Sequence, residues 1–270
     1  MPSTSGTEVV QHFTSEGRIA RNALEVWQSR SNREHVTRTV LSHVTSTPYT
    51  LAADDILRLG TSHSLGSVDQ QEALGVDLIK NWYPDFAFTH LFHLMLEEHK
   101  SVFTWDEFQE WARGAEVRQW LWEPAQAKVG EAQAHGFTHA QARNAMRWRL
   151  GIFYYSFLRE LYVIASLREH GLPLLCHPLA DALFRVDAWC GNVLLELFIA
   201  NREFKAGNSG RKLKTASFFT DQPQFVVVPF EMQRQRIFGQ VHLPGQVQIQ
   251  RCVAAMQRAL DQQGGGAVTQ

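Results

Sequence analysis

Two apolar runs joined by Gly191-Asn192 predict a β-hairpin between residues 182 and 200. Glycine at the first of two central positions is typical of a type II′ turn, whose twist suits paired strands. With these residues as the turn, Asp187 lies directly opposite Glu196 on one face of the hairpin. Two opposed acids repel, and burial adds to the cost unless a cation or a shared proton compensates. We expect the compensator to be a divalent metal ion held by the carboxylate oxygens.

Two other arrangements would relieve this repulsion without a metal ion. One strand could shift its register by a residue, which would turn its side chains to the opposite face. Alternatively, Arg185 could pair with one of the acids at an edge of the sheet. The register of the hairpin therefore decides whether Asp187 and Glu196 lie close enough to need a metal ion.

The surrounding sequence predicts a helical half followed by a mixed half. Apolar periodicity in the first half predicts helices over 17–30, 67–82, 86–99 and 104–122, and nothing there resembles a hairpin. The second half is predicted to contain helices over 139–169, 209–219 and 246–262, with strands over 172–177, 182–190, 193–200, 225–230 and 237–243. We therefore expect a helical domain at 1–138 and a second domain at 139–270.

The order helix, three strands, helix, strand resembles the PD-(D/E)xK nuclease superfamily, which has the restriction-endonuclease-like fold. The resemblance includes an acid on the second strand and another in the middle of the third, and it covers roughly residues 140–235. It implies an α+β protein whose αβββαβ core carries a mixed sheet. It also implies that Asp187 and Glu196 hold Mg²⁺ or Mn²⁺, and that Glu160 on the first core helix is a further acid of the site.

The sequence departs from the family pattern where a lysine is expected. In the family, a lysine two residues after the second acid positions or activates the attacking water, but this chain has Phe198 there. The family tolerates lysines that move to the following helix, and this chain has Lys205, Lys212 and Lys214 in that region. Either Lys212, with Lys205 as second choice, supplies the cation, or the site is inactive.

Charge is distributed unevenly along a chain whose formal net charge is −1. Residues 1–138 hold 11 basic and 18 acidic side chains, whereas residues 139–270 hold 15 basic and 9 acidic ones. Within the basic half, a cationic segment at 201–214 carries Arg202, Lys205, Arg211, Lys212 and Lys214 against one acid. Most charge runs are solvated surface, but this segment directly follows the predicted metal-binding strand. We expect it to contact a phosphate backbone, with Arg143, Arg147 and Arg149 adding to that surface.

Two clusters in the first half have alternative interpretations. The segment HLFHLMLEEH contains residues that could bind zinc or iron: His90, His93, Glu97 and His99. Their spacing fits neither HExxH nor a paired Glu-x-x-His, so ordinary helical residues are favoured. Four tryptophans could stack on bases, although helical packing is favoured: Trp105, Trp111, Trp120 and Trp122.

Together these patterns predict a metal-dependent endonuclease that hydrolyses phosphodiester bonds, with DNA favoured as substrate, within a multi-protein system. The acidic half is then expected to bind a protein partner. The alternatives are an inactive nuclease-fold scaffold that binds nucleic acid or a partner, and an all-helical interaction protein. No apolar run reaches the length of a membrane span, the N-terminus is unlike a signal peptide, and three scattered cysteines suggest no disulfide framework. We therefore expect a cytoplasmic protein without membrane contact.

Overall fold

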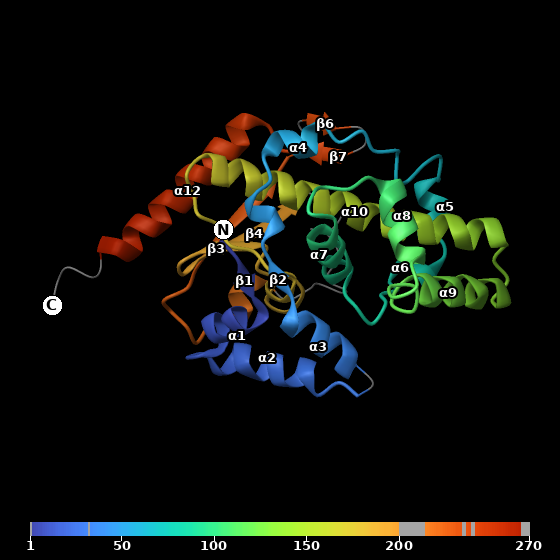
Figure 1. Ribbon diagram of the computed structural model, residues 1–270, viewed down its shortest axis with the longest axis horizontal. Helices are drawn as coiled ribbons and strands as arrows, with labels where there is room; N and C mark the ends of the chain where they lie inside the picture. The colour runs from blue at the N-terminus through green and yellow to red at the C-terminus, as the bar shows by residue number, and fades with distance from the viewer. Residues whose placement is uncertain (1, 32, 200–213, 234–235, 239–240, 266–270) are drawn as a thin grey trace.

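One long helix organises the molecule in the computed structural model, which describes residues 2–31, 33–199, 214–233, 236–238 and 241–265. Helix α10 (His139–Glu169) runs across the molecule, and helices of the first half pack along it (Figure 1). It begins at a capping box between Thr138 and Gln141 and ends before Gly171, whose φ of +86° suits glycine. The predicted bounds 139–169 are confirmed.

The first half is mostly helical, with shorter elements than the sequence predicted. Its helices are α1 (Gly6–Thr14), α2 (Arg18–Gln28), α3 (Glu34–Ser42), α4 (Ala53–Leu57), α5 (Gln70–Leu74), α6 (Asp77–Lys80), α7 (Phe88–His99), α8 (Trp105–Arg113) and α9 (Trp122–Ala134). The helix predicted over 67–82 is two helices, because α5 ends at Gly75, and α8 likewise ends at Gly114. Strands β1 (Thr4–Ser5) and β2 (Val44–Thr45) form an antiparallel pair that the sequence did not indicate.

The hairpin forms in the predicted register. Strand β3 (Ala188–Cys190) pairs antiparallel with β4 (Val193–Ile199), and β4 pairs parallel with β5 (Val226–Met232) in a three-stranded mixed sheet. Ala188 faces Leu195 and Trp189 faces Leu194, so the register-shift alternative is wrong. Gly191 has a φ of +54°, as the first position of a type II′ turn requires. The strands also rule out an all-helical second half.

Other predictions in the second half need correction. Residues 182–184, predicted as the start of a strand, instead belong to a π-helical turn, η2 (Ala180–Phe184), and the strand begins only at Ala188. A short apolar run reads alike as strand and as buried helical turn, which explains the error. From 172–177, only Leu175 bridges to the sheet, at Trp189. Of the helix predicted over 209–219, residues 209–213 lie outside the described residues and Thr215–Phe218 forms the 3₁₀ turn η3.

The C-terminal region ends in the predicted helix. Its predicted single strand over 237–243 is instead an antiparallel pair, β6 (Arg236–Phe238) with β7 (Val241–Leu243). Helix α12 (Gln246–Gly265) then packs on β5, β4 and α10, and its far end extends from the body of the molecule (Figure 1).

The main hydrophobic core draws residues from both halves of the chain. Phe13 of α1 packs against Phe184 and Trp189, with ring centroids 5.4 and 5.2 Å apart. The Tyr49 hydroxyl donates to the Cys176 carbonyl at 2.8 Å and accepts from the Cys176 amide at 3.0 Å. The halves therefore share packing, and their separate roles stay a prediction.

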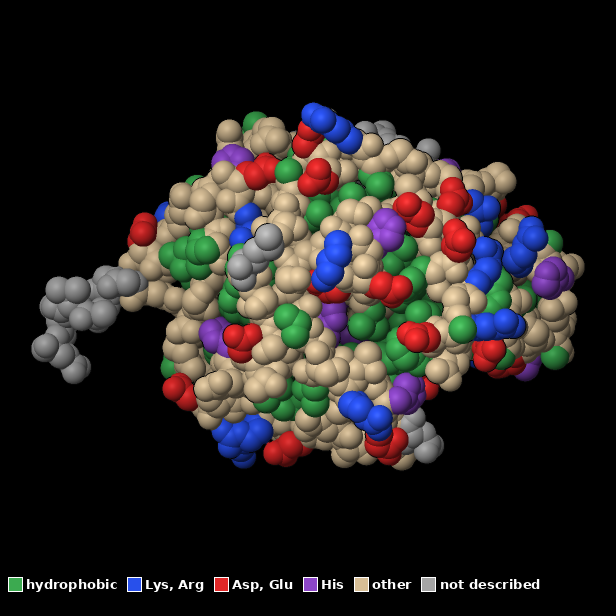
Figure 2. All heavy atoms as spheres, in the orientation of Figure 1, with side chains coloured by type: hydrophobic (Ala, Val, Ile, Leu, Met, Phe, Trp, Pro, Cys, Tyr) green, Lys and Arg blue, Asp and Glu red, His purple; other side chains and the backbone are tan. Residues whose placement is uncertain are grey.

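The surface and the central helix bear on possible partners. By length and composition α10 could cross a membrane, but 78% of its most apolar window is buried inside the protein, as in the core helix of a folded domain. On the face seen in Figure 2, acidic and basic side chains are interspersed rather than gathered into one patch of either sign. Binding of a partner by the acidic half stays a prediction.

Candidate functional site

The predicted acid pair lies where the hairpin begins. Asp187 directly precedes Ala188, the first residue of β3, which pairs with Leu195, the neighbour of Glu196. The Asp187 amide donates to the Leu195 carbonyl at 3.1 Å, and the Leu197 amide donates to Asp187 Oδ2 at 2.6 Å. These bonds fix the Asp187 carboxylate against the middle of β4, next to Glu196.

Two further acids join this pair, and together the four form the acid cluster: Glu160 on α10, Asp181 on η2, Asp187 and Glu196. Burial raises the pKa of Asp187 well above its usual value, and the charges of the other three acids raise it further, against a lowering by the Leu197 amide. Burial and the charge of Asp181 likewise raise the pKa of Glu160. The structure therefore brings the predicted residues Glu160, Asp187 and Glu196 into one electrostatic cluster.

Asp181 was missed by the sequence-based reasoning. It directly precedes the strand predicted over 182–190, and that position gave no reason to place it beside Asp187. The π-helical turn η2 carries it, and the turn ends at Arg185, a non-glycine residue with a φ of +64° whose amide donates to the Asp181 carbonyl at 3.1 Å. Both conformations are uncommon and concentrate at functional sites. Here they bend the chain so that two acids of one short segment converge.

The acid cluster has no cationic partner in the described part of the chain. No lysine or arginine there forms an ion pair with any of the four acids, so the pairing with Arg185 is not found. His93 of α7 lies beside the cluster, with its Nε2 3.9 Å from Glu160 Oε1, but burial lowers the pKa of its imidazole to about 4. Its side chain is 1% exposed, and neither ring nitrogen has a hydrogen-bond partner.

The cationic segment is bounded, among the described residues, by Ile199, the last residue of β4, and by Lys214. Glu196 and Phe198 point to the open face of β4, where Phe198 is 39% exposed. At the other end of the segment, Lys214 is exposed and precedes Thr215, whose hydroxyl donates to the Arg185 carbonyl at 2.7 Å. The remaining predicted cations lie outside the described residues: Arg202, Lys205, Arg211 and Lys212.

Two of the three α10 arginines predicted to extend this surface, Arg147 and Arg149, instead bind backbone carbonyls of the first half. Arg149 is buried, donates to the Trp82 carbonyl at 2.9 Å and stacks on the Tyr83 ring. Arg147 donates to the Ser64 carbonyl at 2.8 Å. At a rise of about 1.5 Å per residue, Arg147 lies about 20 Å along the helix from Glu160. These side chains anchor the first half to α10.

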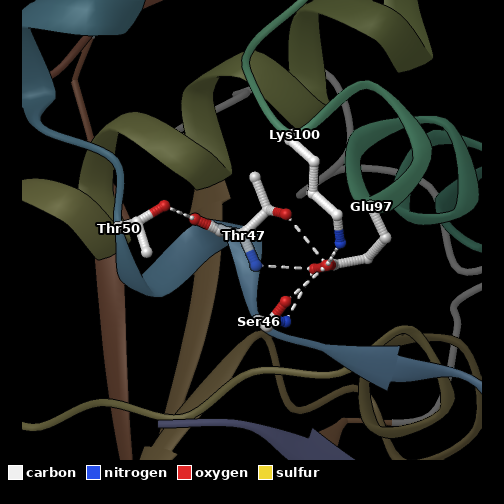
Figure 3. A network of polar contacts seen from close by, with 5 residues as sticks. All are labelled: Ser46, Thr47, Thr50, Glu97 and Lys100. Atoms are coloured by element: carbon white, nitrogen blue, oxygen red, sulfur yellow. Dashed lines mark hydrogen bonds and ion pairs between the residues drawn. The ribbon is translucent and has the colours of Figure 1, made fainter. Parts of the chain in front are cut away.

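Glu97 has a structural role rather than a place among zinc ligands. Figure 3 shows its carboxylate turned toward the turn η1 (Thr47–Tyr49) and the residue before it. It accepts from the amide and hydroxyl of Ser46, both at 2.7 Å, and from those of Thr47, at 2.8 and 2.9 Å. Burial raises the pKa of Glu97, but these bonds outweigh it and leave the pKa below its usual value. The residue joins α7 to η1.

The tryptophans also follow the packing interpretation. Trp105 is buried at the start of α8 and packs against Phe108 and Tyr154, at centroid distances of 5.6 and 5.4 Å. The indole nitrogen of Trp111 donates to Glu98 at 2.8 Å. These contacts leave Trp105 no free face for a base.

Three further buried histidines are held neutral by their surroundings. Burial, and then the charges of neighbouring histidines, lower the pKa of His43, His90 and His177 to about 3, from a usual 6.5. The rings of His43 and His177 lie 5.2 Å apart. The protein therefore holds these imidazoles uncharged at neutral pH.

This arrangement predicts a pH-dependent loss of stability that His90→Gln reduces. Folded His90 binds a proton far less readily than unfolded His90, so the wild type loses stability as the pH falls below 6.5. Between pH 7 and pH 5, His90 should account for about 2 kcal/mol of that loss. Urea unfolding at both pH values should give a pH effect smaller by this amount in the variant. An unchanged difference would contradict the prediction.

Within the described residues, no group of three or more His, Cys, Asp or Glu side chains is already arranged around a metal position. The chain matches no known protein family, no curated protein and no solved structure. The site must therefore be interpreted from its own chemistry.

Proposed function

We propose that this protein is a metal-dependent endonuclease that hydrolyses phosphodiester bonds, with DNA favoured as substrate. The observation that carries the proposal is the acid cluster, four acids from three segments in which burial and neighbouring charges raise the pKa of Glu160 and of Asp187. The cationic segment follows β4 directly in the sequence. Such a group of acids is costly to keep without a compensating cation. A nuclease needs both parts, acids for a metal ion and cations for the phosphates.

The donor set suits Mg²⁺ or Mn²⁺. Both ions accept carboxylate oxygens, and Mg²⁺ commonly uses one or two carboxylates while water and substrate phosphate oxygens fill the remaining positions. A site of that kind needs no group of three protein ligands. Asp187 and Glu196 would hold the ion, and Glu160 would hold a water molecule or the ion from the other side. When bound, the ion would lower the pKa of its water and neutralise charge on the scissile phosphate.

The chain topology supports a restriction-endonuclease-like core. Helix α10 precedes the sheet, β3 and β4 form an antiparallel hairpin, and β5 returns parallel to β4 after the segment that holds the cations. Leu175 adds a bridge at the outer edge, in the position of a first strand. In this proposal Lys212, or else Lys205, orients the attacking water, because Phe198 has no charge with which to do so.

Cleavage assays test the proposal. Wild-type protein should cut DNA with Mg²⁺ or Mn²⁺ and stop with EDTA, and Glu196→Gln should lower the rate at least about a hundredfold, since metal-ion stabilisation supplies several kcal/mol. Asp261→Asn, an exposed change on α12, should leave the rate unchanged. Equal cleavage by Glu196→Gln and wild type, in identical preparations, would mean a contaminating nuclease or another site.

The second candidate is an inactive nuclease-fold scaffold that still binds nucleic acid or a protein partner. Phe198, at the position of the missing lysine, favours it. Calorimetric titration separates the two proposals. DNA binding without any Mn²⁺ binding would select the scaffold, whereas Mn²⁺ binding that Glu196→Gln abolishes would select the nuclease.

A further inference from the structure

His93 reaches the acid cluster from the helical half of the chain. It lies on α7, and its ring packs at an edge against Phe157 of α10, with centroids 5.4 Å apart. Both nitrogens are buried without hydrogen-bond partners, and Nε2 lies toward Glu160 Oε1 at 3.9 Å. A buried polar atom left unpaired costs about 1–3 kcal/mol, so this imidazole is expensive to retain.

The separation between the two atoms suits a shared cation better than a direct bond. At 3.9 Å, His93 Nε2 is too far from Glu160 Oε1 for a hydrogen bond. Nitrogen and oxygen donors each about 2.1 Å from one metal ion lie about 3–4 Å from each other. Asp181 adds a negative charge that acts on both residues.

We propose that His93 and Glu160 hold a cation of the transition-metal class, and that the negative charge of Asp181 helps to attract it. This inference rests on the proposed function. Imidazole nitrogen is a poor ligand for Mg²⁺ but a good one for transition metals, so this pair should make the site prefer Mn²⁺. This ion would be the one that Asp187 and Glu196 hold in the proposed function, and water or phosphate oxygens would fill the positions that remain. The helical half then completes the site rather than serving only as a docking surface.

His90 provides a matched control on the same helix. It is as deeply buried as His93 and its Nε2 also lacks a partner, but its Nδ1 accepts from the Ala87 amide at 3.3 Å. No ion pair joins it to the acid cluster in the described structure. His90→Gln therefore changes an equally buried imidazole without touching the inferred site.

Electron spin-echo spectroscopy of full-length protein with one equivalent of Mn²⁺ tests the inference. Nitrogen coupling to manganese should appear in wild type and His90→Gln and should vanish in His93→Gln. Labelling histidine with ¹⁵N should replace the ¹⁴N modulation frequencies by those of ¹⁵N. Calorimetry should show Mn²⁺ affinity at least about tenfold weaker in His93→Gln, with Mg²⁺ affinity within about twofold of wild type.

Manganese bound to wild type without histidine coupling would overturn the inference, even if His93→Gln fails to fold. Coupling that persists in folded His93→Gln would also overturn it. Glu160→Gln is a second variant that should lose the coupling. DNA cleavage that requires Glu196 but shows no histidine coupling would leave the proposed function standing and this inference refuted. Histidine-coupled manganese in a protein that cuts no DNA would support this inference and refute the proposed function.

Discussion

Asp187→Asn is expected to give a protein that is more stable than the wild type yet unable to cut DNA. Asparagine removes a buried charge that repels three other acids, while its side-chain oxygen can still accept from the Leu197 amide. In EDTA at pH 8, urea unfolding should show a gain of about 1–2 kcal/mol. Metal-dependent cleavage should fall at least about a hundredfold, because one of the two proposed ligands is lost.

The gain in stability from Asp187→Asn is expected to depend on pH in a definite direction. The raised pKa of Asp187 means that the folded protein binds this proton more tightly than the unfolded chain does. The wild type therefore loses stability as the pH rises above the unfolded pKa, and the gain from Asp187→Asn should be larger at pH 8 than at pH 4. Asp261→Asn is the control and should change neither property. A variant less stable than wild type at pH 8 would show that the Asp187 charge is compensated.

Glu97→Ala is expected to cause a loss of stability of about 3 kcal/mol, because five donors, four on Ser46 and Thr47 and one on Lys100, lose a charged acceptor. The carboxylate is 11% exposed and holds the segment that starts at Ser46 against α7 (Figure 3). Urea unfolding at pH 7 measures the loss.

Glu98→Ala is the matched control for this prediction. Glu98 is the next residue of α7, and its carboxylate accepts one bond in an exposed position, from Trp111. Its replacement should cost less than about 1 kcal/mol. Equal losses for the two variants would mean that the bonds shown for Glu97 contribute little to folding.

Local patterns predicted the elements whose ends carry strong signals. Capping at Thr138 and a glycine at 171 bound α10 as predicted, because caps act on the nearest backbone groups. The Gly191-Asn192 turn fixed the register of β3 and β4 for the same local reason. The strand prediction was wrong for residues 182–184, since a short apolar run satisfies both a strand and a buried helical turn.

The sequence by itself determined the hairpin and its register, and with them the proximity of Asp187 to Glu196, because two-residue periodicity and turn geometry act over a few residues. The tertiary structure alone decided that Asp181 and His93 join them. Asp181 arrives through an uncommon backbone turn, and His93 arrives from a helix far away in the sequence. No spacing rule describes such contacts, since they arise only when α7 and η2 pack beside the sheet and burial strengthens the charges they bring together.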